Sequence, residues 1–220
     1  MNENEENKVE GVKEETVKAF NEAKEQMKNI NLKEEAEAGK NLLTKMWKNP
    51  IETIKEIATD KENKTFKTAL LLVAVWAVIA FVNRILYYIT SPYADFELLS
   101  TLKVTLAPVL RVLAMTVALY LVNNRAKTSI SKVLTSVSIA YTPAIAYSLL
   151  RLLLHISSGL SYLLTPIGGI LEIVATILMY FTIKEFTNKD TEESALKEFI
   201  KVEAVFYVIV FAISFLGISL

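Results

Sequence analysis

The hydrophobic residues of this chain fall into five long apolar stretches separated by short polar connections. The stretches run over Thr68 to Ile89, Leu102 to Val122, Lys132 to Ile156, Tyr162 to Ile183 and Phe199 to Leu220. Each supplies the roughly 20 mostly apolar residues that a helix needs to cross the hydrocarbon of a bilayer. The alternation typical of strands is missing, and backbone groups in lipid must be bonded internally, so the pattern predicts helices.

The residues before the first apolar stretch have a different pattern, rich in Lys and Glu with apolar residues at helical spacing. One such stripe comprises Phe20, Ala23, Met27 and Ile30, and a second comprises Leu32, Ala36, Gly39, Leu43 and Met46. A further helix is predicted over residues 49–60, where Asn49 can cap and Pro50 suits the first helical position. We expect a membrane-surface helix that includes Trp47, Pro50, Ile51 and Ile54. The alternative is a solvated helical tether with no partner.

These patterns predict an all-α membrane protein. Residues 67–220 would form a five-helix transmembrane bundle, and residues 1–66 a cytoplasmic, charged, amphipathic helical segment. An apolar content of 52% and a mean hydropathy of +0.35 exceed those of a soluble domain, so the excess is expected in lipid. Lys and Arg occur before the first span and in the second and fourth connections, but not in the first and third. This predicts a multi-pass protein of the cytoplasmic membrane with its N-terminus in the cytoplasm and its C-terminus outside.

Candidate catalytic chemistry is scarce in the sequence. The formal net charge is zero, which gives no indication of nucleic-acid binding, and the chain has no cysteine. Its one histidine, His155, is expected at the outer end of the third span with no carboxylate nearby in sequence to orient it. No metal-ligand cluster and no glycine-rich phosphate loop is present. We therefore expect no enzyme activity, no metal and no cofactor.

Four charged residues lie well inside the predicted spans: Arg84, Arg111, Arg151 and Glu172. Each has small residues at helical spacing, which predicts that all four point into the bundle. Arg111 and Glu172 are each nine or ten residues from the outer end of their span, close to mid-membrane, and are predicted to form an ion pair. Arg84, Arg151 and His155 are expected nearer the outer surface, where long side chains reach the headgroups.

The predicted pair has two interpretations. It is either a fixed strut between the second and fourth spans, which we prefer, or a solute or proton site in a small transporter. The second interpretation draws on residues that are expected to break helices near mid-depth, as at transporter sites: Pro108, Pro143, Pro166, Gly168 and Gly169.

The order of features resembles the Yip (Ypt-interacting protein) membrane-domain family over about Trp47 to Leu220. The supporting residues are "KNPIETIKEI" before the first span, "AYTP" at Ala140 to Pro143, and "NKDTEESALKEF" before the fifth span. Eukaryotic members are similar in having a cytoplasmic N-terminus and five spans, and they act in vesicle traffic by binding Rab GTPases and one another. Their "DLYGP" motif has no counterpart here, which argues against GTPase binding. The Lys-rich, Asn-rich and cysteine-free sequence looks bacterial.

Some bacterial relatives are associated with ABC exporters or envelope stress. The resemblance therefore implies a membrane scaffold or accessory protein that contacts the bilayer and a membrane or cytoplasmic protein partner, and a homo-oligomer is compatible with it. The alternative is a small-solute or ion transporter that uses Arg111 and Glu172.

Overall fold

The computed structural model describes most of the chain as helix. The described residues are Val17, Asn21, Lys24, Glu25 and the ranges 31–60, 62–91, 93–123, 129–187 and 191–218. All regular structure in this part of the chain is helical. The stripe expected at Phe20, Ala23, Met27 and Ile30 lies outside the described residues.

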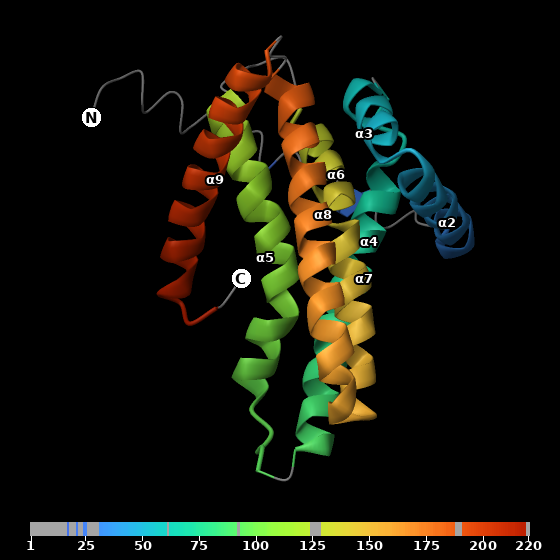
Figure 1. Cartoon of the computed structure of the whole chain (residues 1–220), viewed down its shortest axis with the longest axis vertical. Coiled ribbons are helices and arrows are strands. Elements are labelled where there is room, and N and C mark those ends of the chain that lie inside the picture. Colours follow the sequence, from blue (N-terminus) through green and yellow to red (C-terminus); the bar gives the residue numbers. More distant parts are fainter. Residues whose placement is uncertain are drawn as a thin grey trace.

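The helices follow the predicted stretches closely. Their bounds are α2 (Leu32–Lys48), α3 (Pro50–Thr59), α4 (Phe66–Thr90), α5 (Leu98–Asn123), α6 (Ile130–Ala140), α7 (Thr142–Leu150), the short 3₁₀ helices η1 (Arg151–His155) and η2 (Ser158–Leu160), α8 (Ser161–Thr187) and α9 (Glu192–Ser214). Figure 1 shows α4, α5, α8 and the α6–α7 pair running side by side along the long axis. Helix α9 packs beside α5 and α8, and α2 and α3 lie on the opposite side, against α4, α6 and α8.

Three helices, α4, α5 and α8, are long and apolar enough to cross a membrane. A fourth crossing results if the bent pair formed by α6 and α7–η1 counts as one span. The predicted fifth span does not reach this standard, because α9 carries six charged side chains in its first half and ends at Ser214. The six are Glu192, Glu193, Lys197, Glu198, Lys201 and Glu203. The described part of the chain thus has three to four candidate membrane-spanning helices.

The predicted third span is not one continuous helix. It bends by 43° between α6 and α7, at Tyr141. Pro143 has no N–H to donate to the carbonyl of Ile139, and the Thr142 hydroxyl donates to that carbonyl instead, at 2.8 Å. The break therefore has a local cause, and the freed backbone acceptor keeps a donor.

The other predicted helix breaks do not occur. Pro108 and Pro166 lie inside α5 and α8, and Gly168 and Gly169 are also inside the continuous α8. Membrane helices tolerate such residues where neighbouring groups satisfy the backbone. Gly168 has a packing role, since a Cβ built on it would lie 2.2 Å from Cζ of Tyr147 on α7. Glycine at this position lets α7 and α8 approach closely.

The two helices before α4 pack on the bundle. Pro50 occupies the first position of α3, as predicted, whereas the Asn49 side chain makes no capping hydrogen bond. The prediction that Ile54 faces the membrane surface is wrong, because Ile54 is buried in the protein core and α3 packs on α6 and α8. Trp47 and Ile51 remain exposed, at 88% and 40%.

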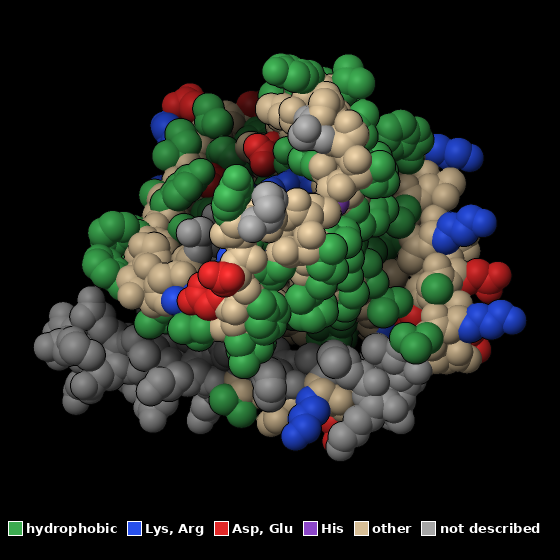
Figure 2. Space-filling model, turned by 90° about the horizontal axis from the view of Figure 1, so that it is seen from below, with side chains coloured by type: hydrophobic (Ala, Val, Ile, Leu, Met, Phe, Trp, Pro, Cys, Tyr) green, Lys and Arg blue, Asp and Glu red, His purple; other side chains and the backbone are tan. Residues whose placement is uncertain are grey.

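The core lies where α5, α6, α8 and α9 meet. Its largest fully buried apolar side chains on these helices are Val112, Met115 and Leu119 of α5, Val133, Val137 and Ile139 of α6, Ile183 of α8 and Val202 of α9. Burial falls off towards the end of the molecule at which α4 connects to α5. Figure 2 views that end and shows a mostly hydrophobic surface that is hollowed near its middle, where basic side chains are visible.

Candidate functional site

Two adjoining cavities within the helical bundle hold the charged residues of the predicted spans. We call the first the carboxylate cavity, because Glu172 and Glu203 line it together with Arg111 and Arg151; its volume is about 540 Å³. We call the second the arginine cavity, because Arg84, Arg111 and Arg151 line it together with His155; its volume is about 640 Å³. The two cavities share the side chains of Trp76, Arg111, Ser148 and Arg151.

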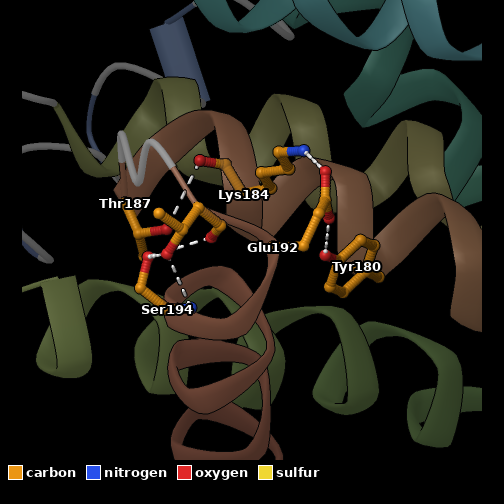
Figure 3. Close-up of polar contacts among 6 residues, drawn as sticks. Tyr180, Lys184, Thr187, Glu192 and Ser194 are labelled. Carbon is orange, nitrogen blue, oxygen red and sulfur yellow. Dashed lines mark hydrogen bonds and ion pairs between the residues drawn. The ribbon is translucent and has the colours of Figure 1, made fainter.

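The register of the α8–α9 hairpin explains why two glutamates face one cavity. Figure 3 shows Glu192, the first residue of α9, accepting a hydrogen bond from the Tyr180 hydroxyl at 2.6 Å and pairing with Lys184 on α8. Glu203 follows Glu192 by about three helical turns, so it lies on the same face of α9, roughly 16 Å along the helix. Glu172 precedes Lys184 by nearly the same number of residues on the antiparallel α8. The two carboxylates therefore lie at similar depth.

A hydroxyl at the start of α9 also helps to hold this register. The Thr191 side chain accepts a hydrogen bond from the backbone N–H of Ser194 at 3.3 Å, which caps the first turn of α9. Glu192 and Glu193 in that turn interact favourably with the positive end of the helix dipole. Farther along, the Phe199 ring packs edge-on to Tyr180, with ring centroids 5.7 Å apart. Helix α9 is thus held against α8 up to the cavity, whose lining includes Phe199.

Arg111 lies between the two cavities, at the middle of α5. Its guanidinium carbon is 5.4 Å from the ring centroid of Tyr141, the residue at the α6–α7 break. The Tyr141 ring in turn packs against Trp76 with centroids 5.7 Å apart. The Nε atom of Arg111 is buried and has no hydrogen-bond partner. The aromatic face attracts the cation, and the Nε–H donor stays available to a ligand or to water.

Arg111 and Glu172, predicted to pair, line the same cavity but form no ion pair; nor does any described acidic side chain pair with Arg111. Glu203, which the sequence analysis did not single out, is also in that cavity and interacts electrostatically with Arg111. The hairpin register was the signal that could have identified it.

Arg84, Arg151 and His155 lie together in the arginine cavity, near the α4–α5 end of the bundle. Nδ1 of His155 is 3.3 Å from the Thr90 hydroxyl, and that hydroxyl donates to the Leu86 carbonyl at 2.8 Å. His155 Nδ1–H is then the donor to Thr90, which leaves Nε2 as the second ring nitrogen available for other contacts. The Thr90 hydroxyl, which lies within hydrogen-bond distance of this histidine, already uses its proton in the bond to the Leu86 carbonyl.

The described residues contain no group of three or more His, Asp or Glu side chains that could hold a metal ion. Comparisons with protein-family models, with curated proteins and with solved structures found no match. The chemistry of the two cavities therefore has to be argued from their own residues. The charged or titratable ones among these include three arginines, two carboxylates and one histidine, and Trp76, Ser148, Asn83, Thr176 and several tyrosines add polar atoms.

Proposed function

We propose that the chain is a multi-pass membrane protein whose carboxylate cavity binds a small polar solute or protons and lets them pass across the bilayer. The observation that carries the proposal is that Arg111, Arg151, Glu172 and Glu203 line one cavity while no ion pair joins them in the described residues. A charge in the middle of a bilayer costs about 3 kcal/mol on insertion scales unless protein, water or solute neutralises it. Charges without direct partners favour a hydrated site over a rigid strut.

The break between α6 and α7 supports the same proposal. Substrate sites of secondary transporters lie near mid-membrane beside discontinuous helices, where backbone groups and side chains converge. Here the break places Tyr141 against Arg111, and the following turn of α7 contributes Ala144 and Ser148 to the cavity wall. A bent helix also offers a joint about which α7 can move relative to α6.

We propose five crossings of the cytoplasmic membrane for this protein, with the N-terminus in the cytoplasm and the C-terminus outside. The distribution of Lys and Arg among the connections supports this arrangement. The end of α9 supports it too, because Gly217 lies close to the Lys103 side chain, near the end of α5 that is predicted to be external. Fusing a reporter that fluoresces only in the cytoplasm to each terminus tests this topology.

Thiol accessibility tests whether water enters the carboxylate cavity. The chain has no cysteine, so a single cysteine can be introduced without further changes. Thr176 lines the cavity, whereas its neighbour Ile177 is 49% exposed on the outside of α8 at the same depth. We expect Thr176→Cys to react with a membrane-impermeant thiol reagent and Ile177→Cys to stay unreactive in lipid. Equal reactivity of the two variants would contradict the claim that the carboxylate cavity is hydrated.

Flux through proteoliposomes tests passage itself. A trapped pH-sensitive dye reports proton movement, and radiolabelled glutamate and lysine serve as anionic and cationic solute probes. We expect Glu172→Gln and Glu203→Gln to abolish or strongly reduce any flux seen with the unchanged chain while the helical content stays the same. Glu185→Gln, a carboxylate of α8 outside both cavities, is the matched control. Flux equal to that of empty liposomes for every probe contradicts the proposal.

A second candidate function is that of a membrane scaffold or accessory protein, as the resemblance to the Yip family implies. It is favoured by α2, which carries exposed apolar side chains at Leu43 (44%) and Trp47 (88%). Hydrogen bonds hold α2 in place, since the Thr68 hydroxyl donates to Glu35 at 2.8 Å and Lys45 donates to Glu56 at 3.1 Å. A fixed apolar surface beside the membrane is suited to contact another membrane protein, such as an exporter subunit.

Site-specific crosslinking distinguishes this second function. A photo-reactive amino acid at Leu43 should yield a defined crosslinked protein in cells, while the same group at Glu37, on the charged face of α2, should not. The crosslinked band is identified by mass spectrometry. If Leu43 gives no band beyond that of Glu37, α2 has no protein partner at this surface.

A further inference from the structure

The arginine cavity has a composition that selects one class of ligand. Its lining includes three guanidinium groups and one imidazole, and it contains no Asp or Glu. The side chains come from α4, α5, α7 and η1, so the site exists only in the assembled bundle. A cavity rich in N–H donors and free of acidic acceptors is complementary to an anion with several oxygen atoms.

One arginine of the cavity is held in place by its neighbours. Nε of Arg84 donates to the Tyr88 hydroxyl at 3.1 Å, and Nη2 donates to the Ser100 hydroxyl at 2.5 Å. The guanidinium carbon also lies 4.7 Å from the Tyr88 ring centroid and 5.1 Å from that of Tyr87. These contacts use two of its five N–H donors and fix its plane, so little side-chain freedom is left to lose when a ligand binds.

The other two arginines still have donors to offer. The Arg151 side chain makes no hydrogen bond or ion pair within the described part of the chain, and the Nε atom of Arg111 is buried without a partner. By contrast, polar groups in the cavity wall between these arginines already have hydrogen-bond partners. Trp76 Nε1 donates to the Ser148 hydroxyl at 2.8 Å, and the Asn83 amide donates to the Ser148 carbonyl at 3.0 Å. The hydrogen-bond donors that remain unpaired in the cavity therefore belong to cationic side chains.

Three guanidinium groups that share one cavity also repel one another in a membrane environment, where charge is weakly screened. A bound anion removes this repulsion. The forked N–H groups of arginine match the oxygens of a phosphate in pairs, and a tetrahedral phosphate presents enough oxygens to reach several arginines at once. The cavity volume of about 640 Å³ leaves room for more than the phosphate group itself.

We propose that the arginine cavity is a binding site for a phosphate group, carried either by a free phosphate compound or by the headgroup of an anionic phospholipid. Its depth suits a headgroup, because Arg84 lies six residues, roughly 9 Å, from the end of α4, and Arg151 is the first residue of η1 at the same end of the bundle. Phosphate binding at this site does not require that the carboxylate cavity passes a solute, and the experiments below test it separately.

Binding is tested with the full chain purified in dodecyl maltoside, a detergent without phosphate. In the first arm, sodium phosphate is titrated against sodium chloride at matched ionic strength, and the thermal unfolding midpoint is measured. In the second arm, phosphatidylglycerol is compared with diacylglycerol of the same acyl chains, and retained lipid is detected by native mass spectrometry. A midpoint increase or retention specific to the phosphate-bearing probe is the expected result in at least one arm.

The variants locate the binding. Arg151→Gln removes a guanidinium that has no internal partner, so its fold should survive, and phosphate affinity should fall about tenfold or more. Arg84→Gln should weaken binding similarly. Lys103→Gln, on α5 near the same end but outside both cavities, should leave the affinity unchanged.

The two arms identify the source of the phosphate. Binding of sodium phosphate indicates a free phosphate compound, and binding of phosphatidylglycerol alone indicates a lipid headgroup; both outcomes support the site. The proposal is overturned if neither probe binds, or if Arg151→Gln binds as tightly as the unchanged chain. It is equally overturned if Lys103→Gln weakens binding as much as Arg151→Gln does, because the attraction would then be non-specific.

Discussion

The contact of Gly168 with Tyr147 gives a sharp prediction about what holds α7 against α8. In the change Gly168→Ala, the new Cβ would lie 2.2 Å from Cζ, 2.3 Å from Cε2 and 2.7 Å from the hydroxyl oxygen of Tyr147. The neighbouring Gly169→Ala is a matched control, because its Cβ would meet no atom within 4 Å. Both changes add one methyl group to the same turn of α8.

The size of the effect follows from these distances. Carbon atoms need roughly 3.5 Å of separation, so the Tyr147 ring or α7 itself would have to withdraw by about 1.3 Å. Overpacking of this kind typically costs about 1–3 kcal/mol. Replacing glycine by alanine inside a helix gains about 1 kcal/mol in propensity, and both variants receive that gain. Because the clashing atoms lie at the far end of the Tyr147 side chain, which can turn, we expect Gly168→Ala to be less stable than Gly169→Ala by about 1 kcal/mol, the low end of that range.

The measurement is reversible unfolding in mixed micelles of dodecyl maltoside and sodium dodecyl sulfate. Helical content by circular dichroism gives the free energy of unfolding for each variant. Fluorescence of Trp76 offers a local signal, since its indole donates to Ser148, the residue that follows Tyr147. In a Trp47→Phe background, Trp76 is the one tryptophan of the chain.

Removing the ring tests the cause. In a Tyr147→Ala background, the clash has no partner, so Gly168→Ala should cost no more than Gly169→Ala. If the two alanine variants differ as much without the ring as with it, the close approach of α7 to α8 is not what constrains Gly168. If they are equally stable in the unchanged background, the packing argument is wrong from the start.

Three further outcomes are expected. The carboxylate of Asp60 accepts the backbone N–H of Lys64 at 2.7 Å, which lowers the pKa of Asp60 below its ordinary value of 3.8. The Asp60 carboxylate therefore stabilises the fold above about pH 3.8, and this contribution is lost as the pH falls through the lower pKa of the folded state. The difference in unfolding free energy between the unchanged chain and Asp60→Asn should therefore shrink on acidification. A difference that grows at low pH contradicts this sign. Thr142→Val removes the hydroxyl that donates to the Ile139 carbonyl at the helix break and should cost about 0.5–1.5 kcal/mol in the same unfolding assay, whereas Thr142→Ser should be tolerated. Exchanging the charges with Arg111→Glu and Glu172→Arg together should not restore the folded yield lost in either single variant, because no ion pair joins the two; full recovery would point to a direct pair.

Much of the helical organisation could be predicted from the sequence, because apolar runs and polar connections are local properties. The first span was predicted over Thr68 to Ile89 and the helix runs from Phe66 to Thr90; the fourth was predicted over Tyr162 to Ile183 and α8 runs from Ser161 to Thr187. Lipid requires that each backbone group bond within its own segment, so a long enough apolar run is sufficient to predict a helix. The break at Pro143 also has a local cause, the missing N–H.

The same reasoning also predicted three helix breaks that do not occur. They are at Pro108, at Pro166 and at the Gly168–Gly169 pair, where α5 and α8 are continuous. Whether a proline interrupts a membrane helix depends on what neighbouring helices offer to the freed carbonyl, and that is not written in the local sequence. The failure at Ile54 has a related origin. Its spacing indicates an apolar face, but only the packing of α3 on α6 and α8 decides that protein, not lipid, covers it.

The sequence by itself determined which segments are helices, which residues bring charge into them, and that small neighbours accompany those charges. Only the tertiary structure decided which charges meet. It placed Arg111 over Tyr141, brought Glu203 opposite Glu172 through the register of the α8–α9 hairpin, and gathered Arg84 and Arg151 around one cavity. The physical reason is that helix formation depends on residues within one or two turns, whereas the partner of a buried charge depends on the relative height and rotation of helices far apart in the chain.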